Sequence, residues 1–93
     1  MIKSFRCRET EKIFYREFSR KFPRNIQERA FMKLNAIDAA CKLEDLRLPL
    51  SNRLEALKGA RKGQQSIRIN DPWRICFEWL SGNAEQVGIV DYH

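Results

Sequence analysis

Apolar and polar residues alternate one by one near the end of the chain, which predicts β-strands. The apolar side chains at positions 73, 75, 77 and 79 alternate with Arg74, Cys76 and Glu78, so they share one face of a strand and Arg74 points to the other. Residues 86–93 form a second run, and Ser81-Gly82-Asn83 suits the turn between them. Antiparallel pairing would bring an exposed Arg74 close to the last three residues, Asp91, Tyr92 and His93.

Two further short segments have strand character. In residues 65–70, Ile67 and Ile69 alternate with polar residues, and Asn70-Asp71-Pro72 then predicts a turn into the next strand. Residues 2–6 at the start of the chain form a weaker strand candidate.

Between these strands, apolar residues recur at helical spacing. Thr10 is a candidate cap for a first helix whose apolar stripe contains Ile13, Phe14 and Phe18. The residue before Pro23 is pushed away from helical dihedrals, so this helix should end there. A second helix then begins at Pro23, or is capped by Asn25, and its apolar stripe is Ile26, Ala30, Leu34, Ile37 and Cys41.

The element order therefore predicts an α+β fold formed by a single domain, residues 1–93. Two N-terminal helices would pack on one face of a small, mostly antiparallel sheet, in the order strand, helix, helix, strand, strand, strand. Residues 43–52 contain a proline and mixed charges, and residues 53–63 are basic and contain two glycines, so both predict connections without long elements. The other face of the sheet should be partly open and basic, and we expect a functional site there.

Charge indicates a polyanionic partner. The chain has 18 Lys and Arg against 12 Asp and Glu, a net charge of +6. Residues 3–29 hold nine basic and four acidic side chains, and residues 53–74 hold six and two, whereas residues 75–93 hold three acidic side chains and no Lys or Arg. Localised basic charge of this kind is typical of proteins that bind RNA, DNA, a ribosome or an acidic protein.

The cysteines and the N-terminus favour a reducing, cytoplasmic location. Cys7, Cys41 and Cys76 are odd in number and lack C-x-x-C spacing, so they indicate neither a disulfide framework nor a metal site. No stretch resembles a signal peptide or a transmembrane helix, and we expect no membrane partner. The residue pattern also calls for no cofactor.

The predicted cluster around Arg74 has two interpretations. Arg74 and Asp91 could form a surface ion pair, worth about 0–1 kcal/mol. Alternatively, a guanidinium that binds phosphate, two titratable groups (Asp91 and His93) and a ring that can stack (Tyr92) together supply what is needed to hold and cleave a phosphodiester.

The residues also resemble a known family. The segments 1–5, 53–59 and 66–70, the Trp73-Arg74 pair with Phe77, and the final Asp91-Tyr92-His93 resemble the HigB toxins of the RelE/ParE superfamily of toxin-antitoxin systems, over the whole length. That resemblance implies a RelE-like fold and a metal-independent, ribosome-dependent endoribonuclease, an mRNA interferase that cuts mRNA in the decoding site and inhibits translation. It also implies neutralisation by a helix-turn-helix antitoxin of the HigA type.

Carried over by position, the resemblance assigns an active site to Lys58, Arg74, Asp91, Tyr92 and His93. In RNA cleavage without a metal, the ribose 2′-hydroxyl attacks the adjacent phosphate, which requires a base, an acid and cations around the phosphate. Asp91 and His93 are the candidates for base and acid, in an order that the sequence leaves open. Some relatives carry a histidine where Glu55 stands; this carboxylate would either be an alternative base or pair with a neighbouring arginine.

A further set of basic residues would contact RNA or the ribosome through phosphate groups; it comprises Lys12, Arg16, Arg20, Arg53, Arg61, Lys62 and Arg68. Ordinary solubilising charge is the alternative for these residues. Two other functions stay open at this point: a ParE-like inhibitor of DNA gyrase that hydrolyses nothing, and a small nucleic-acid-binding regulator without chemistry.

Overall fold

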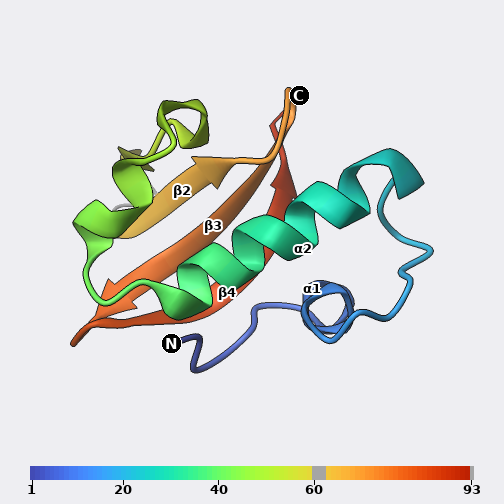
Figure 1. Cartoon of the computed structure of the whole chain (residues 1–93), viewed down its shortest axis with the longest axis horizontal. Helices are drawn as coiled ribbons and strands as arrows, with labels where there is room; N and C mark the ends of the chain where they lie inside the picture. The colour runs from blue at the N-terminus through green and yellow to red at the C-terminus, as the bar shows by residue number, and fades with distance from the viewer. Residues whose placement is uncertain (60–62, 93) are drawn as a thin grey trace.

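A computed structural model describes residues 1–59 and 63–92. The described elements are α1 (Arg8–Phe14), α2 (Arg24–Ala39), the 3-10 helices η1 (Leu43–Arg47) and η2 (Leu50–Asn52), and the strands β1 (Glu55–Ala56), β2 (Gln64–Arg68), β3 (Trp73–Leu80) and β4 (Asn83–Asp91). The strands form an antiparallel sheet in the order β1-β2-β3-β4. Figure 1 shows α2 crossing one face of this sheet with α1 beside it, so the predicted two-layer α+β fold is confirmed.

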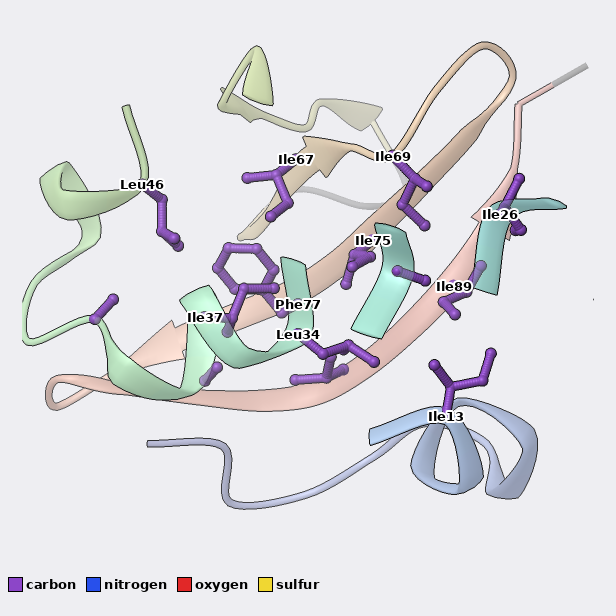
Figure 2. Packing of buried hydrophobic residues seen from close by; sticks show 14 of the residues in the cluster. Ile13, Ile26, Leu34, Ile37, Leu46, Ile67, Ile69, Ile75, Phe77 and Ile89 are labelled. Atoms are coloured by element: carbon purple, nitrogen blue, oxygen red, sulfur yellow. The ribbon is translucent and has the colours of Figure 1, made fainter. Parts of the chain in front are cut away.

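The core lies between the helices and the sheet. Ile26, Ala30, Leu34 and Ile37 of α2 are all buried, as the helical stripe predicts. From the sheet, Ile67, Ile75 and Phe77 are fully buried against them, and Ile13 of α1 joins the same cluster (Figure 2). The apolar residues that recur every second position in the strands and about every 3.6 positions in α2 thus pack against each other in one core.

The first helix is shorter than predicted. It begins at Arg8 with Cys7 at the cap position, so Thr10 lies inside the helix and does not cap it. Thr10 is fully buried, and its Oγ1 accepts a hydrogen bond from the backbone N–H of Ile89 at 3.1 Å, which ties α1 to β4. Arg16 adopts left-handed dihedrals (φ 65°) just after the helix, and Phe18 is 54% exposed and outside the core.

The second helix begins with Pro23 at its cap position, so the alternative in which Asn25 caps it is wrong. The helix ends at Ala39, because Ala40 has extended dihedrals. Cys41 therefore lies beyond the helix and is exposed, where the sequence pattern predicts a buried position.

The N-terminal strand is reduced to two isolated parallel bridges, Ile2 with Ala84 and Phe5 with Val87. Gln86 of β4 has a left-handed φ of 53° between the two bridges, and its N–H donates to Ser4 Oγ at 2.9 Å instead of to a backbone carbonyl. This local turn in β4 prevents a continuous ladder. The fourth strand of the sheet is β1, which the sequence pattern does not predict.

The predicted hairpin is confirmed. β3 and β4 pair from Leu80 with Asn83 to Trp73 with Asp91, with an irregularity between Cys76 and Glu78. The turn between them contains Ser81 and Gly82, both with positive φ. No helix in the described residues is long and apolar enough to cross a membrane.

Candidate active site

The candidate site is built around Arg74, the second residue of β3. Trp73 and Ile75 on either side of it belong to the core that faces the helices, so the Arg74 side chain points to the opposite face of the sheet. The side chain is only 11% exposed. The expectation of an exposed cation is therefore wrong, because β1 and the residues just before it cover this part of the face.

Three hydrogen bonds fix the guanidinium. Nε donates to Ser66 Oγ at 2.9 Å, and Nη2 donates to the backbone carbonyl of Arg53 at 2.7 Å and to that of Ser66 at 3.4 Å. Ser66 is fully buried in β2, in the strand position opposite Cys76. A largely buried cation with several aligned acceptors has little freedom to rotate, so one edge of the guanidinium is held by the protein and its orientation is set before any ligand binds.

Arg53 supplies its carbonyl because of its backbone conformation. It follows η2 with left-handed dihedrals, φ 46° and ψ 53°. Its N–H donates to the carbonyl of Leu50 at 3.1 Å, which closes the turn. The turn directs the Arg53 carbonyl toward Arg74, while the Arg53 side chain stays exposed and available to a ligand.

Glu55 lies beside the same guanidinium. Its Oε1 is 3.7 Å from Arg74 Nη2, and the Glu55 side chain is 54% exposed. Of the two roles that the sequence leaves open for this carboxylate, the structure shows the pairing with an arginine. At this distance and exposure the pair is weak, so the carboxylate remains accessible to a ligand.

Tyr92 completes the cluster from the end of β4. The Arg74 Cζ atom lies 5.9 Å from the centre of the Tyr92 ring, within the range of a cation–π contact. The Tyr92 N–H donates to the carbonyl of Pro72 at 2.9 Å, and its hydroxyl lies 3.8 Å from the Sγ of the buried Cys76. Tyr92 is 40% exposed, so one part of the ring packs on the sheet and another faces solvent.

Asp91 and Lys58 are positioned by the strands next to them. Asp91 is exposed and is the strand partner of Trp73, so strand alternation puts its side chain on the face of Trp73, opposite to that of Arg74. Lys58 is exposed in the loop that follows β1, just after Leu57, whose N–H donates to the carbonyl of Gln64 at 2.9 Å. His93, Arg61 and Lys62, also expected in the site or in RNA binding, lie outside the described residues.

The other predicted RNA-binding residues lie at several places. Lys12 of α1 pairs with Glu9 at 3.3 Å, and Arg16 pairs with Glu28 at 3.1 Å and stacks over the Phe31 ring at 4.0 Å. Arg20 is exposed in the segment between the helices. Arg68 is the strand partner of Arg74 and is much closer to the candidate site. The helix residues are in the layer that covers the other face of the sheet (Figure 1).

One pKa near the site is shifted. The hydrogen bond from Arg68 Nε at 3.1 Å, together with the charge of Arg68, lowers the pKa of Asp71 below its usual value, with smaller contributions from the charges of Arg53 and Arg74. The positive potential from these arginines thus extends to the β2–β3 turn. A phosphate that enters this region would be attracted by the same charges.

Sequence reasoning missed the two groups that hold Arg74. The alternation in residues 65–70 places Ser66 on the same face as Arg74, which was a usable signal. The contribution of Arg53 comes from its main chain in a left-handed turn, and no side-chain pattern predicts it.

The sequence is similar to those of known proteins. The family model for RelE-like toxins of the type II toxin-antitoxin system HigB matches residues 3–93. Endoribonuclease HigB of Proteus vulgaris is 33% identical over 93 residues, all of both chains. Toxin HigB-1 of Vibrio cholerae is 45% identical over 65 residues, which are 70% of this chain and 68% of that protein.

A solved structure shares the fold. The crystal structure of a YafQ mutant from E. coli superposes with a TM-score of 0.50 over 95% of this chain and 92% of that one, at 14% identity. The agreement of a family model over almost the whole length with two similar HigB proteins shows the family. The chain belongs to the HigB-like family of RelE-like toxins of type II toxin-antitoxin systems.

Proposed function

We propose that this toxin is a metal-independent endoribonuclease that cuts mRNA in the decoding site of the ribosome and so inhibits translation in the cytoplasm. The observation that carries the proposal is the fixed guanidinium of Arg74, held on one edge by Ser66 and Arg53 beside a half-exposed tyrosine ring. The name Endoribonuclease HigB of the Proteus vulgaris relative supports the same activity. An antitoxin of the helix-turn-helix HigA type would neutralise it.

The reaction would begin with attack of a ribose 2′-hydroxyl on the adjacent phosphate. A pentacoordinate phosphate with extra negative charge then forms, and the 5′-oxygen leaves with a proton. Arg74 is suited to stabilise that charge, because hydrogen-bond donors that are already oriented need no reorganisation in the transition state. Lys58, on the exposed loop, would add a second positive charge.

Proton transfer would be divided among the carboxylates and the C-terminal histidine. Asp91 and His93 are the candidates for general base and general acid, since each is adjacent to Tyr92 in the sequence. Glu55 is an additional candidate base because it is exposed and already adjacent to the guanidinium. Tyr92 would stack on a base of the message and orient the nucleotide for in-line attack.

Binding to the ribosome would use cations on both faces of the molecule. Arg53, Arg61, Lys62 and Arg68 lie near the site in sequence, and Lys12, Arg16 and Arg20 would contact ribosomal RNA from the helix layer. Each phosphate contact releases counterions, so binding should weaken steeply as salt increases.

A cleavage assay on ribosomes programmed with a defined mRNA tests the proposal. We expect the wild-type protein to cut the message. Arg74→Ala should remain folded and cut at least about 100-fold more slowly, because one oriented, charged hydrogen-bond donor is lost. Arg24→Ala is the matched control, since Arg24 is exposed at the start of α2 and far from this face. His93→Ala and Asp91→Asn, compared over pH, would then assign base and acid.

This cleavage assay, together with a DNA gyrase supercoiling assay, separates the alternatives. Intact message together with blocked supercoiling by DNA gyrase would show a ParE-like inhibitor and refute the nuclease proposal. Intact message with active gyrase would leave the small nucleic-acid-binding regulator without chemistry.

A further inference from the structure

A groove with a volume of about 630 Å³ lies along the flank of α2, beside the segment that carries η2. Its apolar lining comprises Met32, Ala36 and Pro49, and its polar lining comprises Asn25, Glu28, Arg29, Lys33 and Asn52. Met32 is 64% exposed, and Leu48 and Leu50 in the adjoining segment are 69% and 80% exposed. Aliphatic side chains this exposed on a small protein indicate a contact surface for another protein.

Within residues 1–59 and 63–92, Arg29 and Lys33 have no acidic partner, and Glu28 in the same lining pairs with Arg16. The ion pairs among residues 1–59 and 63–92 involve other cations. Arg29 Nη1 donates to the carbonyl of Ile69 at 3.3 Å, and Lys33 Nζ donates to Asn52 Oδ1. Partial burial lowers the pKa of Lys33, and the charge of Arg29 one turn earlier lowers it further. The negative charge of a carboxylate placed between them would favour the charged form of Lys33 and so offset both effects.

A second hollow continues the groove toward the sheet. It has a volume of about 300 Å³ and shares Arg29 and Lys33 with the first, adding Ser51, Arg68 and Ile69. Arg68 is held there by Asp71 at 3.1 Å, but the Asp71 side chain is 91% exposed and is easily exchanged for another carboxylate. The combined surface is therefore apolar at one end and cationic at the other.

We propose that this surface is the docking site for the antitoxin, and that it takes an acidic, amphipathic segment of that protein. An apolar side chain of the segment would pack on Met32 and Pro49, and a neighbouring Asp or Glu would lie between Arg29 and Lys33. An antitoxin is the partner that membership of this family implies, and its docking on this groove does not depend on RNA cleavage. RNA fits the apolar end poorly, because the groove lining offers no aromatic ring on which a base could stack.

Two groove variants and two matched controls test the proposal. Arg29→Glu reverses a groove cation, and Arg24→Glu makes the same change five residues earlier on α2, outside the groove. Met32→Asp places a charge on the apolar wall. Its control is Leu80→Asp at the end of β3, where the parent side chain is 53% exposed and again outside the groove.

The measurement is the Kd of each toxin variant for the purified full-length antitoxin of the same pair, by calorimetry, with thermal unfolding recorded in parallel. We expect Arg29→Glu and Met32→Asp to weaken binding about tenfold or more, as loss of a central contact does, and both controls to bind like wild type. If either groove variant unfolds, the milder Met32→Ala replaces it, and we expect a severalfold loss of affinity for the antitoxin.

Cleavage of mRNA on ribosomes is measured for the same proteins. If the wild-type protein does not cut mRNA, the proposed nuclease activity is refuted, and the result on antitoxin docking still stands. Wild-type antitoxin affinity in the folded groove variants would overturn the docking proposal. Wild-type antitoxin affinity combined with weaker sedimentation with ribosomes would overturn it in favour of an RNA-binding surface.

Discussion

Ser66 is expected to set the orientation of Arg74, and Ser66→Ala tests this with the smallest possible change. The substitution removes a single oxygen atom from a fully buried side chain. It deletes the acceptor 2.9 Å from Arg74 Nε and leaves the carbonyls of Arg53 and Ser66 in place. The positive charge therefore stays at the site, but one of its three anchors is lost.

The magnitude follows from the burial of the guanidinium. A hydrogen bond to a charged group contributes about 1.5–3 kcal/mol, and with the Arg74 side chain only 11% exposed, water replaces the lost acceptor poorly. Two anchors remain, so we expect the lower end of that range. About 1.4 kcal/mol corresponds to a tenfold decrease in kcat. KM should change little, because the charge that attracts the phosphate is retained.

The assay is single-turnover cleavage of mRNA on programmed ribosomes, with the free energy of unfolding measured in urea. Ser19→Ala is the matched control. Ser19 is also fully buried, and its Oγ donates to Glu9 Oε1 at 2.7 Å in the segment between the helices, far from Arg74. Both variants should lose stability, but only Ser66→Ala should cut more slowly.

A double-mutant cycle separates positioning from general destabilisation. In Arg74→Lys the charge remains but Nε is gone, so adding Ser66→Ala should cost almost nothing further in kcat. Additive effects of the two substitutions on kcat would refute a positioning role for Ser66. An unchanged kcat in Ser66→Ala alone would refute it as well.

Three further predictions concern stability. Leu34→Ala should cost about 2–5 kcal/mol of unfolding free energy, since Leu34 is fully buried, whereas Met32→Ala on the exposed side of α2 should cost little; urea unfolding of both variants checks this. Backbone hydrogen bonds from Cys41 and Lys42 lower the pKa of Asp45, so its stabilising contribution is present above about pH 4 and is lost as the pH falls through the folded-state pKa. The destabilisation by Asp45→Asn should therefore shrink in acid, and urea titrations in which it is the same at pH 6 and pH 3 would contradict this. In Gly88→Ala the new Cβ would lie 2.8 Å from Arg6 Cδ and 3.2 Å from its Cβ, which should cost about 1–3 kcal/mol; adding Arg6→Ala should restore most of the thermal stability, and failure to do so would place the strain elsewhere.

The sequence predicts the parts of the fold that depend on long periodic patterns. The stripe of α2 from Ile26 to Ile37 and the alternation around Ile75 are repeated often enough that one register buries far more apolar surface than any other. The same alternation predicts the hairpin that brings Tyr92 to Arg74. Both features were predicted correctly from side-chain type alone.

The predictions from sequence are wrong where a single residue or the main-chain conformation determines the local structure. The pattern cannot show that Thr10 bonds to a strand instead of capping its helix, or that a left-handed Gln86 interrupts pairing with the N-terminal segment. Strand β1 has only two residues, too few for any alternation, and it exists because it pairs with β2. The burial of Arg74 follows from that pairing, so it was missed for the same reason.

The bridges between the N-terminal segment and β4 have a consequence for self-association. Backbone groups of residues 1–6 exchange hydrogen bonds with Ala84 and Val87, at 2.8–3.1 Å, along the outer side of the last strand. An uncovered strand there would be a template for pairing with another copy of the chain and for aggregation. A few irregular residues thus protect the longest strand from intermolecular pairing, while the opposite margin of the sheet is protected by the shortness of β1.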